Sequence, residues 1–208
     1  ELDLYADGAP RIASQMNPLS VQSSITGQAW RWRHAAGSQS DDLVTQLLLA
    51  RGCSADALDA HRTPTLRDFM PDPSIFRDME RAATRLADAV EFSEAVTIFG
   101  DYDVDGATSA ALLVRLLRDL GLAPAAYIPD RLMEGYGPSG EALVRIAKGG
   151  ATLIVTVDCG AQAFEACQMA HEVGVDVIIV DHHQCATTLP IAHAVVNPNR
   201  LDEDGPST

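Results

Sequence analysis

Val177-Ile178-Ile179-Val180 is an apolar run that ends directly in Asp181-His182-His183. Four consecutive β-branched residues without polar alternation are typical of a strand that is buried on both faces, as in a parallel sheet. Two further runs have the same form, because residues 95–100 lead into an acidic stretch and residues 153–157 lead into Asp158. The sequence therefore predicts three buried strands that each end in residues able to bind a metal ion.

Strands and helices alternate around these three runs. We expect strands at 95–100, 125–128, 152–157, 176–180 and 194–196, and helices at 107–120, 139–148 and 162–173. In the first of these helices, polar residues form one stripe and leucines cover much of the remaining surface, which indicates that it packs against a sheet. Alternating βα units predict an α/β fold, namely a doubly wound parallel sheet flanked by helices.

The N-terminal part has a different pattern, which we interpret as mainly helical and irregular. Leucines at helical spacing predict a helix between a cap at Asp41 and a stop at Gly52, and a second helix is expected at 74–89. We interpret Trp30-Arg31-Trp32-Arg33 as an edge strand with one buried face, and contact with nucleic acid is the alternative. The predicted domain boundary lies between residues 94 and 95.

Composition limits the class of protein without deciding its function. The chain has 208 residues and is 47% hydrophobic, so it can bury a core. It has no apolar run long enough to span a membrane, no signal peptide and no paired cysteine motif, so we expect a cytoplasmic, reduced protein. The net charge of −14 argues against a generic nucleic-acid-binding surface. It does not exclude a nuclease, since a cation cluster offsets its own carboxylates.

The acidic stretch after the first strand favours hard divalent cations. Asp101, Asp103 and Asp105 are carboxylates at alternate positions, and such groups repel one another unless a cation lies between them. Oxygen ligands of this kind suit Mg²⁺ or Mn²⁺. The alternative is a solvated acidic turn in which Asp105 caps the helix that follows.

The other two strand ends supply a bridging carboxylate and imidazoles. Because ligands bind outside the carboxyl ends of parallel strands, we expect all three strand ends to form one site. Asp158 is the best candidate to bridge two ions, which together polarise a phosphoryl group and generate hydroxide at neutral pH. His182 favours Mn²⁺ over Mg²⁺, His183 can donate to the phosphoryl or leaving oxygen, and Asp181 can orient a histidine. The alternative is a hydrogen-bonded pair of surface histidines.

Four further residues are candidates for substrate binding. Gly106 allows a tight turn, and the helix that opens through Ser109 offers backbone N–H groups to a phosphate. Arg131 can grip a phosphate, and Asn197 follows the last strand at the same predicted edge. Tyr136 can stack on a base or shape its loop. For the loop 131–138, the alternative is a glycine-rich connection with a surface Arg–Glu pair.

Taken in order, these motifs resemble the DHH phosphoesterase family, and within it the RecJ group of single-strand exonucleases. The segments that carry the resemblance are 100–109, 131–137, 157–160, 181–183 and 196–199. The resemblance implies that Asp103, Asp105, Asp158 and His182 are metal ligands. It also implies that Asp101 supports the first motif and that His183 acts on the phosphate.

The same resemblance implies an activity and a cofactor. RecJ proteins degrade single-stranded DNA in the 5′→3′ direction in repair and recombination. The resemblance also implies a site for Mn²⁺ or Mg²⁺, and we expect two ions there. RecJ proteins are far longer than 208 residues, so we expect an incomplete DHH domain over 95–208 and weak or no activity from this fragment alone. We further expect a monomer whose partners are single-stranded DNA and replication or repair proteins. The alternatives are a phosphodiesterase for small oligonucleotides or cyclic dinucleotides, and a non-catalytic fragment that binds a partner.

Overall fold

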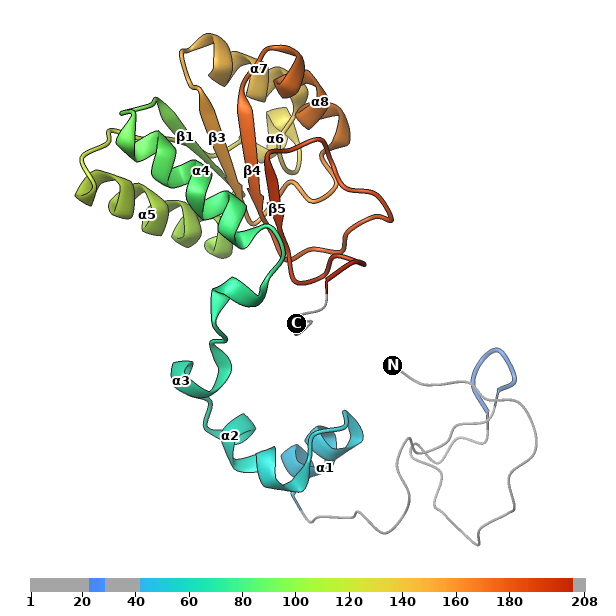
Figure 1. The fold of residues 1–208 in the computed structure, drawn as a ribbon. Coiled ribbons are helices and arrows are strands. Elements are labelled where there is room, and N and C mark those ends of the chain that lie inside the picture. Colours follow the sequence, from blue (N-terminus) through green and yellow to red (C-terminus); the bar gives the residue numbers. More distant parts are fainter. Residues whose placement is uncertain (1–22, 29–41, 204–208) are drawn as a thin grey trace, which may run out of the picture. The chain divides into compact units, whose positions relative to one another are not determined.

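The computed structural model describes residues 23–28 and 42–203, and the chain divides into two compact units, Glu1–Pro71 and Asp72–Thr208. The described part of the first unit contains α1 (Leu43–Ala50), α2 (Leu58–Arg62), α3 (Leu66–Phe69) and the 3₁₀ turn η1 (Ala55–Ala57) (Figure 1). The cap of α1 is Asp42, whose carboxylate accepts a hydrogen bond from Thr45 N at 3.0 Å, and not Asp41 as the sequence predicted. The predicted strand at residues 30–33 and Asp41 itself lie outside the described residues.

The second unit is built on a parallel sheet with the order β2-β1-β3-β4-β5. The strands are β1 (Val96–Gly100), β2 (Ala125–Tyr127), β3 (Leu153–Val157), β4 (Asp176–Val180) and β5 (Ala194–Val196). The helices are α4 (Met79–Glu91), α5 (Val104–Asp119), α6 (Arg131–Glu134), α7 (Gly140–Lys148) and α8 (Phe164–Glu172), preceded by the 3₁₀ turn η2 (Pro73–Ile75). The predicted α/β fold, with a parallel sheet flanked by helices, is confirmed.

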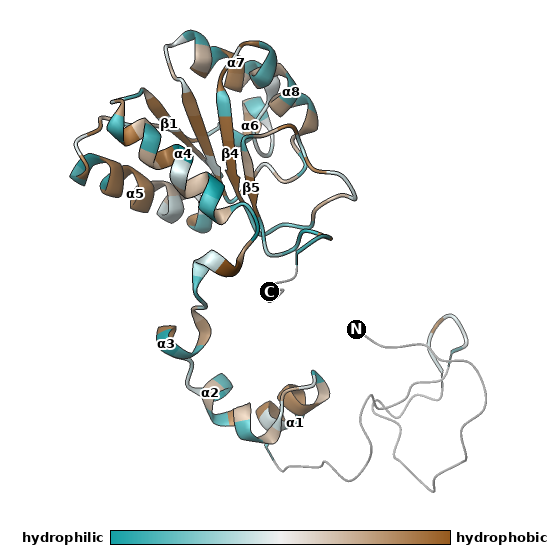
Figure 2. Cartoon of the chain, viewed as in Figure 1, coloured by the Kyte–Doolittle hydropathy of each residue, from teal (hydrophilic) through white to brown (hydrophobic). Residues whose placement is uncertain are grey.

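The sheet is buried on both faces, which explains the absence of polar alternation in its strands. On one face Ile98, Val155 and Ile178 pack against α4 and α5, whereas α7 and α8 cover the other face (Figure 1). The strands are correspondingly the most apolar part of this unit (Figure 2). Among the described residues, no helix is long and apolar enough to cross a membrane.

Two helices begin at other residues than the sequence predicted. The helix expected at 74–89 begins at Met79, because Asp78 adopts a left-handed conformation with φ 60° and its carboxylate accepts a hydrogen bond from Val195 N. This contact joins the start of α4 to the sheet, and both lie in the unit Asp72–Thr208. The domain boundary between residues 94 and 95 stays a prediction. The helix expected at 107–120 begins at Val104, because Asp103 caps it.

The loop between β2 and α7 and the surface of α5 also differ from expectation. Residues Arg131–Glu134 form the short helix α6, capped by Asp130, within the segment 131–138 that the sequence predicted to be a loop. Three of the leucines that cover the apolar part of α5 and its C-cap are substantially exposed: Leu112, Leu116 and Leu120. The buried side of α5 is formed by smaller residues together with Leu117, because only a narrow stripe of the helix faces the strands.

Candidate metal centre

The register of the sheet brings the three acidic strand ends to one edge. Gly100 pairs with Val157, and Val157 pairs with Val180, so the residues that follow these strands are also neighbours. Each continues the ladder by one hydrogen bond: Asp101 N to Val157 O at 3.3 Å, Asp158 N to Val180 O at 2.9 Å and Asp181 N to Val196 O at 3.0 Å. Convergence of the three strand ends, expected from the topology, is therefore built into the backbone pairing.

Three carboxylates gather at the ends of β1 and β3. Asp101, Asp103 and Asp158 each offer an oxygen such that all three oxygens lie within 4.8 Å of one another. Asp101 Oδ1 and Asp158 Oδ2 are buried and accept no hydrogen bond from any residue that the structure describes. A buried carboxylate oxygen without a donor is costly, and a divalent cation removes that cost. Burial, charge and spacing of these oxygens therefore fit an oxygen-ligated cation.

The electrostatics of this group point the same way. Burial, together with the neighbouring Asp103 carboxylate, raises the pKa of Asp158. The pKa of Asp103 is lowered, chiefly because Gly106 N donates to its Oδ1 at 3.0 Å. Asp158 also has φ 61°, a backbone conformation that costs a non-glycine residue energy and that is common at functional sites. The fold thus tolerates both charge repulsion and strain at Asp158.

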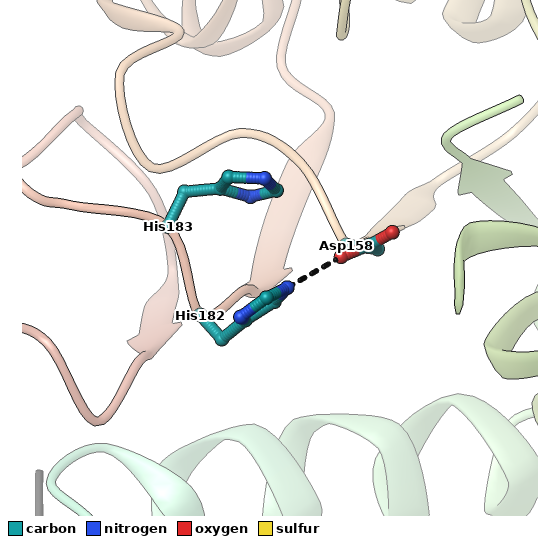
Figure 3. A group of neighbouring side chains, drawn as sticks. All are labelled: Asp158, His182 and His183. Carbon is teal, nitrogen blue, oxygen red and sulfur yellow. Dashed lines mark hydrogen bonds and ion pairs between the residues drawn. The ribbon is translucent and has the colours of Figure 1, made fainter. Parts of the chain in front are cut away.

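The imidazole nitrogens of the histidine pair lie close to the carboxylate of Asp158. Asp158, His182 and His183 form a second group whose ligand atoms lie within 4.8 Å of one another. His182 Nε2 lies 3.0 Å from Asp158 Oδ1, and the His183 ring lies beside them (Figure 3). Asp158 belongs to both groups, and its role as a bridging ligand stays a prediction.

Asp181 contacts the ring of one histidine, and its role in orienting a metal-site histidine stays a prediction. Its side chain is 1% exposed, and its Oδ1 lies 2.7 Å from His183 Nδ1. This hydrogen bond raises the pKa of His183, although partial burial of the ring acts in the opposite direction. Burial would raise the pKa of Asp181, but N–H groups, including that of Ala161 at 2.8 Å, outweigh it and lower that pKa.

Asp105 lies outside both groups of neighbouring ligand atoms in the described part of the chain. It is exposed in the first turn of α5, where its backbone N–H donates to Asp103 Oδ1 at 3.0 Å. The helix cap is therefore Asp103, and the alternative that Asp105 caps α5 is wrong. The role of Asp105 as a metal ligand stays a prediction.

Three residues predicted to contact the substrate have close neighbours within the protein itself. Gly106 is buried, and a Cβ there would lie 2.4 Å from Asp101 O, so the glycine allows α5 to approach the end of β1. Ser109 lines an apolar cavity between α4 and α5 rather than the acidic edge. Asn197 is fully buried, and both ends of its amide are hydrogen-bonded within the protein.

The exposed residues beside the histidines are aromatic and basic. The Arg131 guanidinium lies over the Tyr102 ring, 5.1 Å from its centroid, and Tyr102 makes an edge contact with Tyr136. The Tyr136 hydroxyl is 3.2 Å from His183 Nε2, and burial together with Asp181 raises the pKa of this phenol. Sequence reasoning missed Tyr102, although its place between two predicted ligands was a usable signal. Tyr136 thus lies beside His183, and Arg131 is joined to it through Tyr102, while substrate binding by these residues stays a prediction.

Comparison with known proteins identifies the family. Residues 95–208 match the model described as "DHH family, N-terminal domain". The chain belongs to the DHH family. This match covers more than half of the chain and includes each strand that the structure describes and all the residues of the two ligand groups.

Similar DHH proteins are known by sequence and by structure. The chain is 40% identical over 159 residues to "Single-stranded-DNA-specific exonuclease RecJ" of Bacillus subtilis, a match that covers 76% of the chain and 20% of that protein. It is 41% identical over 130 residues to the Escherichia coli protein of the same name, covering 62% and 22%. A crystal structure of "exonuclease RecJ bound to manganese" matches with a TM-score of 0.58 and 37% identity, covering 63% of the chain and 33% of that structure. The chain thus spans about a fifth of the length of these curated relatives.

Proposed function

We propose that this DHH chain forms part of a 5′→3′ exonuclease for single-stranded DNA, acting in repair and recombination and dependent on Mn²⁺ or Mg²⁺. The observation that carries the proposal is the shared carboxylate of Asp158, which belongs both to the acidic group and to the histidine group. The printed activity of the RecJ relatives and the manganese in similar structures support the choice of reaction and ion. Single-stranded DNA as partner and a cytoplasmic location belong to the same proposal.

The proposed metal ligands are Asp101, Asp103, Asp158 and His182, with Asp105 as a further candidate from the sequence. Two ions held there would polarise the phosphodiester and activate water. The buried Asp158 holds the centre of the site, and Asp103 is kept ionised by the N–H groups at the start of α5. The site therefore offers fixed negative charge without depending on mobile side chains.

His183 is the proposed proton donor to the phosphoryl or leaving oxygen. Asp181 Oδ1 lies 2.7 Å from its Nδ1, which leaves Nε2 as the nitrogen available to the substrate, and the Tyr136 hydroxyl lies 3.3 Å from Nδ1 and 3.2 Å from Nε2. The raised pKa of His183 favours the protonated ring that such a donor requires. Arg131, stacked on Tyr102, supplies positive charge at the same rim for a phosphate of the incoming strand.

The first test is metal binding by the chain itself. Titration of Mn²⁺ into residues 1–208, followed by calorimetry, should give a saturable signal that His182→Ala reduces and Asp158→Ala abolishes. Leu153→Ala, at the opposite end of β3, is the matched control and should bind as the unsubstituted chain does. Equal binding by all four proteins would refute the assigned site.

The second test concerns the substrate. In the protein that contains this chain, Asp158→Ala should abolish the Mn²⁺-dependent release of nucleotides from a 5′-labelled single strand. A preference for dinucleotides or cyclic dinucleotides over long single strands would instead favour a small-substrate phosphodiesterase. We expect the isolated fragment to cleave poorly, and robust nuclease activity from residues 1–208 would contradict that expectation.

A further inference from the structure

A short segment after β5, residues 197–200, contacts the turn that carries the histidine pair. We propose that Asn197 and Asn199 are positioning residues, which clamp the backbone of His182 and His183 so that both imidazoles face Asp158 before metal binds. The inference rests on the proposed function and extends it to residues that act through the histidines. It replaces the substrate contact that the sequence predicted for Asn197.

The contacts of Asn197 are those of a clamp. Its side chain is fully buried, and its amide Nδ2 donates to the backbone carbonyl of His183 at 2.9 Å. Its Oδ1 accepts the backbone N–H of Asn199 at 2.7 Å. Asn199 then donates from its own Nδ2 to the carbonyl of His182. Two successive amides therefore bind two successive carbonyls of the histidine turn.

The same turn is bound from its other side by Asp181. The Oδ1 of Asp181 accepts the backbone N–H of His182 at 2.7 Å and that of His183 at 3.1 Å. Both backbone N–H groups and both carbonyls of the histidine pair are therefore bound by side chains. Such a turn is fixed without forming part of a helix or strand.

The clamp segment is itself anchored to the core of the unit. The Arg200 side chain is only 7% exposed and donates to Val195 O at 2.6 Å and to Asp78 Oδ2 at 3.0 Å. Asp78 Oδ2 also accepts Val195 N at 3.0 Å, so one carboxylate joins the start of α4, β5 and the clamp. Displacement of Asn197 would therefore have to break contacts on two elements.

The rings themselves need this support, because packing covers only part of each ring. The side chains of His182 and His183 are 57% and 45% exposed, respectively. Rings so exposed keep their place largely through the backbone that carries them and through Asp158 and Asp181. Partners that orient metal-binding histidines commonly matter about tenfold or more for metal affinity.

Two substitutions test the clamp. Asn197→Asp keeps the size of the side chain and an acceptor for Asn199 N, but it places a carboxylate oxygen against the carbonyl of His183. Asn199→Ala removes the donor to His182 and involves a less buried side chain, so it guards against misfolding of the first variant. Leu153→Ala is the control for lost stability, since it creates a cavity in the core at the far end of β3.

Two measurements on residues 1–208 are compared across these proteins. The first is the ¹⁵N-resolved spectrum of the histidine rings without metal, in which His183 Nδ1–H should be sharp and slow to exchange because Asp181 holds it. The second is Mn²⁺ affinity by calorimetry. We expect both Asn variants to broaden the His183 signal and to weaken Mn²⁺ binding about tenfold or more. Leu153→Ala should do neither.

Each outcome decides the inference. Unchanged ring spectra and affinities in both Asn variants would overturn it, and so would equal changes in Leu153→Ala, because lost stability would then account for them. If the unsubstituted chain binds no Mn²⁺, the proposed metal site fails, and the ring spectra of the metal-free proteins still decide whether the clamp exists.

Discussion

Replacing Gly106 with alanine should disable the metal centre through a single methyl group. A Cβ at this position would lie 2.4 Å from Asp101 O and 2.5 Å from Asp101 N, both of them backbone atoms. Ordinary van der Waals contact begins at about 3.4 Å, so α5 and the end of β1 must separate by about 1 Å. No rotation of a side chain can relieve this contact, because the crowded atoms belong to the main chain of a ligand-bearing residue.

The size of the effect follows from where the shift occurs. Metal sites tolerate ligand displacements of only about 0.2 Å, and overpacking of a buried position costs about 1–3 kcal/mol of stability. The shift moves Asp101 relative to Asp103, whose carboxylate is bound to Gly106 N. We therefore expect Gly106→Ala to lose about 1–3 kcal/mol in free energy of unfolding. Its Mn²⁺ affinity should fall about tenfold or more.

Urea unfolding and Mn²⁺ calorimetry on residues 1–208 measure the two effects separately. Gly149→Ala is the matched control, because Gly149 has φ −74° and a Cβ there would come no closer than 3.1 Å to the nearest carbonyl, Ile146 O. It lies after α7, away from the ligand groups, and should leave Mn²⁺ affinity unchanged. Wild-type Mn²⁺ affinity in Gly106→Ala would refute the argument that this close approach sets the geometry of the site.

Three further predictions concern charge and metal. Asp158→Asn should stabilise the metal-free protein by about 0.5–2 kcal/mol, because it removes a buried charge beside another carboxylate, and a lower melting temperature in EDTA would contradict this. Mn²⁺ at about 100 times the Kd of the wild-type chain should raise its free energy of unfolding by about 2.7 kcal/mol, and EDTA should reverse the gain. At the same Mn²⁺ concentration His182→Ala should gain less, and an equal gain would argue against this ligand. Hydrogen bonds from Arg85 and Thr152 lower the pKa of Glu94, so its contribution to stability exists above the unfolded pKa of about 4.3 and is lost as pH falls through the lower folded value. Glu94→Gln should therefore cost about 1–3 kcal/mol at pH 7, and urea unfolding should show a smaller difference from wild type near pH 3; a constant difference would refute the linkage.

The sequence carries enough information to predict the sheet and the edge where the ligands gather. Short runs rich in β-branched residues, such as Leu153–Val157, favour buried strands, and parallel pairing then places their ends together. The order of the strands was not predicted, because right-handed crossovers still leave several arrangements. Asp158 and His182 were predicted as neighbours on the basis of parallel pairing, and their ligand atoms lie 3.0 Å apart.

What could not be predicted depends on contacts between residues that are distant in the sequence. Asp78 breaks the predicted helix because its carboxylate binds β5, more than a hundred residues later. Asn197 was assigned to substrate because its position at the strand end is visible in the sequence, whereas the carbonyl that it binds is not. The types of residue at the strand ends indicate which edge of the sheet binds ligands. Which of those side chains face outward depends on their hydrogen-bond partners, and the sequence does not show these.

The proposed ligands come from segments that are adjacent in the sheet, while the polypeptide between those segments supplies mainly packing. Spatial adjacency of β1, β3 and β4 therefore matters more to the chemistry than the order in which the chain visits them. Residues inserted at the exposed turn around Gly121 would leave every one of these strand pairings in place. A chain lengthened at that turn should still capture manganese.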